Sequence, residues 1–127
     1  MYVNENNHKR INFRMVFQGM VIGFLLLLLI TSFMAVIFSL FDFVSFDIIS
    51  TILLIFNFLI ITFIGFYIAQ NVNRNGWLNG GLGGSIYMGV LIFLTYFSNP
   101  LSWGTVILLL ILGLIVGSIG GILGINF

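Results

Sequence analysis

Four long apolar runs divide the chain, and they constrain its fold more than any other feature. They cover residues 15–41, 48–69, 80–97 and 104–125. A helix that rises about 1.5 Å per residue needs about 20 apolar residues to cross the roughly 30 Å hydrocarbon layer of a bilayer. Each run is near this length, whereas the strands of a transmembrane barrel are shorter and alternate in polarity. The sequence therefore predicts an all-α membrane protein with four transmembrane helices joined by short loops.

The low charge content supports the same conclusion. Only 6% of the 127 residues are charged, and 61% are hydrophobic. Soluble domains carry about 25% charged residues, and a soluble chain of this composition would expose apolar patches that aggregate. We therefore expect the lipid bilayer to surround most of the chain. The formal net charge of +1 provides no strong basic field for backbone phosphates, so no nucleic-acid partner is expected.

The basic residues all fall on one side of the predicted membrane. They are Lys9, Arg10, Arg14 and Arg74, which lie before the first run or between the second and third. Because basic residues near span ends stay in the cytoplasm, both the N-terminus and the C-terminus are predicted to be cytoplasmic. The outer loops are then Asp42–Asp47 and Ser98–Trp103, and the inner loop is Gln70–Asn79. Residues 1–14 are predicted to form a polar cytoplasmic tail, and residues 15–127 a single transmembrane domain. The first run is too long for a cleaved signal peptide.

Small residues recur at helical spacing within the runs. The predicted packing residues are Gly65, Ala69, Gly76, Gly80, Gly81, Gly84, Ser85, Gly89, Gly113, Gly117, Gly120, Gly121 and Gly124, and Gly19 and Gly23 begin the first run in the same way. In lipid, the hydrophobic effect does not drive helices together, and small residues favour association because they let backbones approach. These stripes are therefore interpreted as helix-packing surfaces.

The stretch GWLNGGLGGSIYMG at 76–89 has a second interpretation, as a loop that holds a phosphate group. Such a loop needs the pattern GxxxxGK[ST], or GxGxxG between a strand and a helix. Neither context is present, and no lysine follows the glycines. The helical interpretation is therefore preferred.

Four polar residues lie near the middle of the predicted spans. Asn57 and Tyr87 are expected about 14 and 15 Å from the outer ends of their helices, and Thr31 and Ser32 lie at a similar level. Unpaired amide and hydroxyl groups cost several kcal/mol in hydrocarbon, so these groups should find partners. Hydrogen bonds between helices are the favoured interpretation, and a midplane site for a substrate or an ion is the alternative.

The segment GFYIAQNVNRNGWLNGGLGGSIY at 65–87, followed by an apolar helix and a glycine-striped one, resembles the YrzE-like family. These are small four-span membrane proteins of Gram-positive bacteria with no assigned biochemical function. The resemblance extends from about Phe17 to Gly124. It implies a multi-pass protein of the bacterial cytoplasmic membrane, and it supplies no active-site residue.

The residues available for chemistry limit the possible functions. The chain has no cysteine, and its runs contain no Asp, Glu, Lys, Arg or His, so neither an enzyme nor a cofactor or metal site is expected. The favoured function is that of a structural or accessory membrane protein, which contacts copies of itself or a larger envelope complex. A small oligomeric transporter or channel is the alternative, although small multidrug exporters depend on a membrane-embedded glutamate that is missing here. A phage-type holin and an internally duplicated hairpin are both compatible with the sequence.

Overall fold

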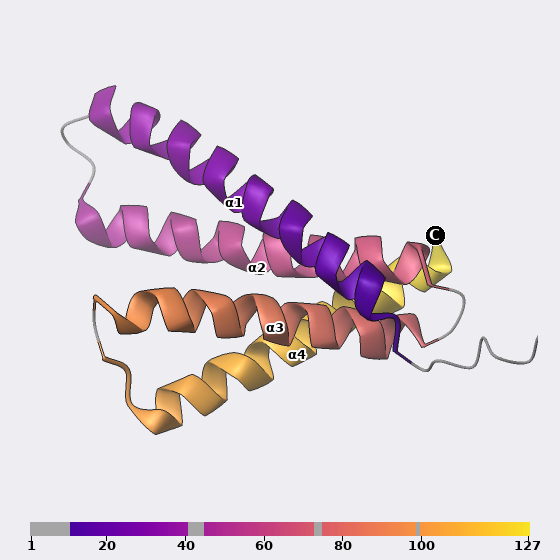
Figure 1. Cartoon of the computed structure of the whole chain (residues 1–127). Helices are drawn as coiled ribbons and strands as arrows, with labels where there is room; N and C mark the ends of the chain where they lie inside the picture. The colour runs from indigo at the N-terminus through magenta and orange to yellow at the C-terminus, as the bar shows by residue number, and fades with distance from the viewer. Residues whose placement is uncertain (1–10, 41–44, 73–74, 99) are drawn as a thin grey trace, which may run out of the picture.

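The computed structural model describes residues 11–40, 45–72, 75–98 and 100–127. These residues form four α-helices: α1 (Phe13–Leu40), α2 (Phe46–Gln70), α3 (Gly76–Tyr96) and α4 (Trp103–Asn126), as Figure 1 shows. Each helix is long and apolar enough to cross a membrane. The prediction of an all-helical chain with four such helices is confirmed.

The start of α3 differs most from the predicted spans. The third run was expected from residue 80, but the helix begins at Gly76, and all other described bounds agree within two residues. Asn75, the residue before it, has the left-handed φ of 55°. The first turn of α3 is not apolar, so hydropathy alone misses it, yet it is packed: a Cβ on Gly76 would lie 2.7 Å from Ile125 Cγ1 of α4. The inner connection is therefore shorter than the predicted loop Gln70–Asn79, and Asn79 belongs to α3.

The helices run up and down, with α2 and α3 in the middle of the bundle. Among the described residues, α1 contacts α2 and α3, α4 contacts the same two helices, and α1 and α4 do not meet. The start of α1, the end of α2, the start of α3 and the end of α4 lie at one end, which we call the tight end (Figure 1). At the opposite end α1 diverges from α2, and α4 diverges from α3. We call this the open end.

The buried core lies toward the tight end. In α2, Ile61, Ile64 and Ile68 are completely buried, whereas Phe46 and Leu54, near the open end, are 81% and 56% exposed. The core cluster also includes Val16 of α1 and Tyr87 and Met88 of α3. Side-chain packing therefore holds the bundle together at the tight end and the middle, and it loosens toward the open end.

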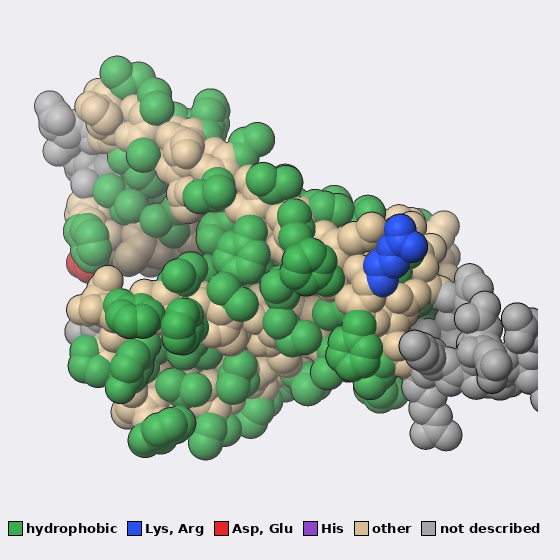
Figure 2. Space-filling view, in the orientation of Figure 1, with side chains coloured by type: hydrophobic (Ala, Val, Ile, Leu, Met, Phe, Trp, Pro, Cys, Tyr) green, Lys and Arg blue, Asp and Glu red, His purple; other side chains and the backbone are tan. Residues whose placement is uncertain are grey.

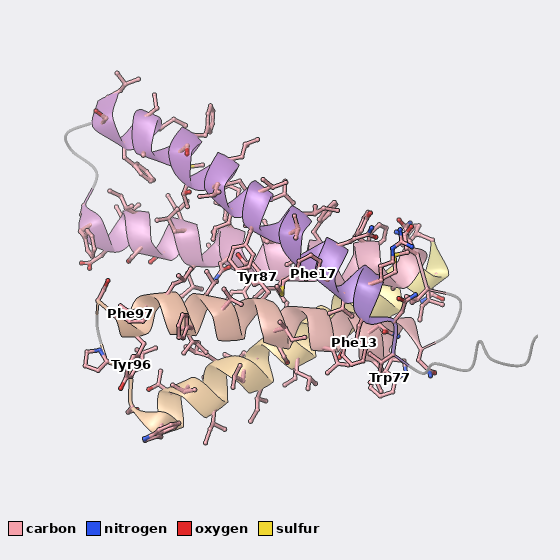
Figure 3. The ribbon with its side chains drawn as sticks, in the orientation of Figure 1. Phe13, Phe17, Trp77, Tyr87, Tyr96 and Phe97 are labelled. Atoms are coloured by element: carbon pink, nitrogen blue, oxygen red, sulfur yellow. The ribbon has the colours of Figure 1, made fainter. Side chains whose placement is uncertain are left out.

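The outer surface suits a hydrocarbon environment. Figure 2 shows apolar side chains over most of the visible face, with the described basic and acidic side chains at opposite ends. Arg14 lies in the first turn of α1 and Asp47 in the first turn of α2, and these turns are at the tight and open ends. Aromatic residues lie near both ends, with Trp77 at one and Tyr96 at the other (Figure 3). Trp and Tyr are enriched where spans meet the headgroup region.

Candidate functional site

Glycines line the contact between α3 and α4. A Cβ built on Gly80 would lie 2.7 Å from the carbonyl oxygen of Gly117, and one on Gly117 would lie 2.5 Å from that of Gly80. A Cβ on Gly113 would lie 2.8 Å from the carbonyl oxygen of Gly84. Real Cβ atoms essentially never come this close to a neighbour, and backbone carbonyls cannot rotate away. Only glycine fits at these positions while the helices keep this separation.

The contact between α2 and α4 has the same character. Cβ atoms on Gly65, Gly120 and Gly124 would meet the backbone carbonyls of Gly117, Thr62 and Phe66 on the facing helix. Ala69 is buried at the end of α2, and a Cβ on Gly124 would lie 2.9 Å from its Cβ. Gly121, by contrast, faces α3, since its Cβ would lie 2.6 Å from the carbonyl oxygen of Gly76. The glycines of α4 thus lie against two helices at once.

Glycines also face side chains between α1, α2 and α3. A Cβ on Gly19 would lie 2.6 Å from Ile68 Cγ1, and Gly23 faces Ile64 in the same way. Gly83 of α3 packs on Ile68 as well. Gly83 is not among the predicted packing residues, because it lies outside the first stripe of α3, about 20° around the helix from Gly76. Its place four residues before Tyr87, on the same face of a helix, was the available signal.

The remaining predicted small residues are less crowded or face polar groups. Gly81 lies against the Ser118 hydroxyl, and the Ser85 hydroxyl donates a hydrogen bond to the Leu110 carbonyl oxygen at 3.2 Å. A Cβ on Gly89 would make only an ordinary contact, 3.7 Å from Leu110 Cδ2. Close approach of α3 and α4 therefore ends between Gly84 and Gly89.

Two of the four midplane polar residues come together. The Tyr87 hydroxyl donates a hydrogen bond to Asn57 Oδ1 at 3.0 Å, which joins α3 to α2. Tyr87 is completely buried, and its ring packs on Phe24 of α1 with ring centroids 5.0 Å apart. Figure 3 places Tyr87 in the middle of the bundle. One aromatic side chain thus contacts α1 and α2 from α3.

The other two midplane residues stay apart from this pair. The Thr31 hydroxyl donates to the Leu27 carbonyl oxygen of its own helix at 2.8 Å. Ser32 is exposed on α1, nine residues from Gly23 and hence about half a turn away from the face that packs on α2. Ala35 and Ser39, also exposed, follow on this outer side of α1. We call Ser32, Ala35 and Ser39 the α1 small-residue face.

A polar cluster at the tight end was missed by the sequence analysis. Asn79 is 1% exposed, and its Oδ1 accepts a hydrogen bond from the backbone N–H of Asn12 at 2.7 Å. Its Nδ2 donates to the Asn75 carbonyl oxygen at 3.0 Å. Asn12 in turn accepts from the backbone N–H of Met15 in the first turn of α1. Asn79 was assigned to a loop. On a helix it is three residues after Gly76 and four before Gly83, which places it on the same face as these two buried glycines.

The geometry of the described residues indicates the class of protein. Four helices that are long and apolar enough to cross a membrane are the feature of a multi-pass membrane protein. Among the described residues, no three His, Cys, Asp or Glu side chains lie together.

The chain belongs to the family described as "Protein of unknown function (DUF3792)", whose sequence profile matches residues 12–124. This match agrees with the expectation that an uncharacterised family covers most of the chain. No curated protein matches the chain, and no solved structure matches it.

Proposed function

We propose that this chain is a structural or accessory protein of a cell membrane, which acts through helix–helix contacts with copies of itself or with a larger envelope complex. In this proposal both termini lie in the cytoplasm and the open end faces outward, in accord with the side of the basic residues. The resemblance to the YrzE-like family favours a bacterial cytoplasmic membrane. The glycine stripes serve to hold the bundle together, and they leave α1 as the helix that is available to partners.

The α1 small-residue face is the observation that carries this proposal. α1 is the least buried helix, with Val16, Gly19 and Gly23 as its buried residues. On its opposite side, Ala35 and Ser39 have the small-xxx-small spacing that lets two membrane helices approach closely. Serine hydroxyls can also bond across helices in lipid. A second helix packed here would bury small residues that otherwise contact only lipid.

Cysteine cross-linking tests this contact, and the chain has no native cysteine to interfere. Ala35→Cys should form a covalent dimer, or one discrete larger product, on mild oxidation in native membranes. Ile111→Cys is the matched control, because Ile111 is an exposed aliphatic position near the middle of α4. Mass spectrometry of the product identifies the partner. A tagged chain that elutes alone as a monomer, with equal and weak cross-linking at both positions, would contradict the proposal.

A small oligomeric transporter or channel is the second candidate, and the Tyr87–Asn57 pair favours it. This pair lies where the helices begin to diverge toward the open end, so a polar group of a passing solute could meet Asn57 at mid-membrane. Purified protein in liposomes should then conduct ions or release an entrapped solute, and Asn57→Leu should abolish that flux. The accessory proposal predicts no flux from either protein.

A further inference from the structure

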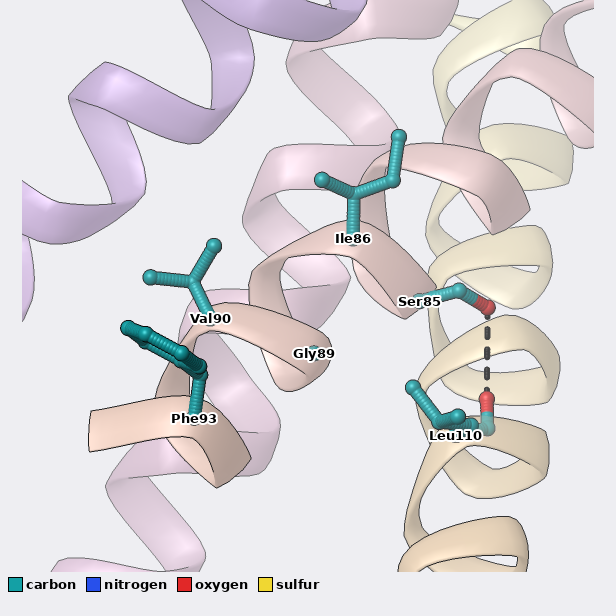
Figure 4. Close-up of a pocket in the computed structure, with 6 residues that line it drawn as sticks. All are labelled: Ser85, Ile86, Gly89, Val90, Phe93 and Leu110. Atoms are coloured by element: carbon teal, nitrogen blue, oxygen red, sulfur yellow. Dashed lines mark hydrogen bonds between the residues drawn. The ribbon is translucent and has the colours of Figure 1, made fainter. Parts of the chain in front are cut away.

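A groove opens between α3 and α4 beyond the last close glycine contact. Its volume is about 450 Å³, and Figure 4 shows the residues that line it: Ser85, Ile86, Gly89, Val90 and Phe93 from α3 and Leu110 from α4. The hydrogen bond from the Ser85 hydroxyl to the Leu110 carbonyl oxygen joins the two helices at the groove. This bond uses the only polar side chain of the lining, so the groove presents apolar surface.

Gly89 and Gly104 are the two helical glycines that packing does not require. A glycine within a helix costs roughly 1 kcal/mol relative to alanine, and at Gly80 and Gly84 the approach of a backbone explains this cost. At Gly89 the nearest atom to a built Cβ is Leu110 Cδ2 at 3.7 Å, an ordinary contact. The missing side chain has a different effect here, which is to widen the groove.

The depth of the groove fixes the medium that fills it. Gly89 lies seven residues before the end of α3 at Tyr96, or about 10 Å along the helix axis. This depth is less than half of the roughly 30 Å hydrocarbon layer. The groove therefore lies where the acyl chains of one leaflet are the surrounding solvent. An apolar cavity of about 150 Å³ stays dry and takes up a molecule of the size of benzene. The groove has about three times this volume and is open to its surroundings on one side, so a longer apolar group can lie in it.

We propose that the groove binds one acyl chain of a bilayer lipid, from the leaflet at the open end. Phe93 forms a wall beside the chain, and its edge-to-face contact with Phe97, with ring centroids 5.2 Å apart, fixes the orientation of this wall. The sequence from Phe93 to Leu110 contains no charged residue. Recognition therefore rests on the acyl chain of the lipid, and the headgroup contributes no preference between zwitterionic and anionic lipids.

Photo-labelling in vesicles tests the proposal with defined probes. The protein is reconstituted in phosphatidylcholine that contains a small fraction of phosphatidylcholine with a diazirine in one acyl chain. After irradiation, peptides are mapped by mass spectrometry, and adducts on Ile86–Phe93 are compared with adducts on the exposed surface of α1. We expect an excess on Ile86–Phe93. Gly89→Leu should remove this excess, because the leucine side chain fills the groove.

Two variants separate loss of binding from loss of structure. Gly104→Leu adds the same side chain at a helical glycine with nothing within 4 Å of its Cβ, and it should keep the excess. Phe93→Ala removes an exposed wall outside the buried core and should lower the excess even if Gly89→Leu fails to assemble. Labelling at the level of α1 in the wild type, or an excess that survives both Gly89→Leu and Phe93→Ala, overturns the proposal. The same labelling is repeated with a phosphatidylglycerol probe. An excess seen with only one of the two probes overturns recognition by the acyl chain alone.

Discussion

Alanine at Gly84 tests the close approach of α3 to its neighbours by adding a single carbon atom. The new Cβ would meet the Gly113 carbonyl, and it would lie 3.0 Å from Ile61 Cγ2 and 3.1 Å from Gly117 Cα. Two of these three neighbours are backbone atoms of α4, which can yield only if the whole helix moves. Such a movement would also loosen the nearby contact between Gly80 and Gly117.

The size of the effect follows from two opposing terms. Alanine favours the helix over glycine by roughly 0.5–1 kcal/mol, whereas overpacking a close-packed interior costs about 1–3 kcal/mol. Gly89→Ala makes the same chemical change in the same helix, but with room for the added carbon. The helix term cancels between the two variants, whatever its size in lipid. Gly84→Ala should therefore be about 1–3 kcal/mol less stable than Gly89→Ala.

Unfolding in mixed micelles with an increasing fraction of sodium dodecyl sulfate measures this difference. Tryptophan fluorescence is a suitable signal, because the backbone of Trp77 lies in the α3–α4 contact, where a Cβ on Gly121 would lie 2.8 Å from the Trp77 Cα. The half-exposed Trp77 side chain changes its surroundings when the two helices separate. Size-exclusion profiles in mild detergent show whether the assembly changes as well. Equal stabilities for Gly84→Ala and Gly89→Ala would refute the argument that the glycine stripe sets the helix separation.

Two further predictions concern the buried hydrogen bond and the orientation in the membrane. If the bond between Tyr87 and Asn57 stabilises the bundle, the double variant Asn57→Leu with Tyr87→Phe should lose about 0.6–1.7 kcal/mol less than the sum of the single losses, and strict additivity would contradict this. With cytoplasmic termini, a cysteine in place of Ser45 should react with an impermeant thiol reagent added outside intact cells, whereas a cysteine in place of Asn71 should not. The reverse labelling pattern would place both termini outside.

The number of helices and their approximate limits could be predicted from the sequence, because the length of an apolar run and the thickness of a bilayer determine both. The start of α3 could not, since hydropathy reports depth in the membrane and the first turn of α3 is held by contacts with Ile125. The pairing of Tyr87 with Asn57 required knowledge of which faces of α2 and α3 meet. The same holds for Asn79, whose partner Asn12 is 67 residues away in the sequence.

The composition of α3 has a consequence for how the chain enters the membrane. An 18-residue stretch of α3 has a mean hydropathy of 1.4, whereas such stretches of the other three helices have values between 2.5 and 2.8. α3 and α4 each contain six glycines, so the difference lies in their other side chains. α3 includes Trp77, Asn79 and Tyr87, whereas the rest of α4 is mostly Ile, Leu and Val, and the transfer of α3 from water to lipid is therefore the weakest. α1, α2 and α4 have enough apolar surface to partition into the bilayer as single helices. The position of α3 in the bilayer therefore depends most on its neighbours, with α4, which is synthesised after α3, contributing its glycine-lined face.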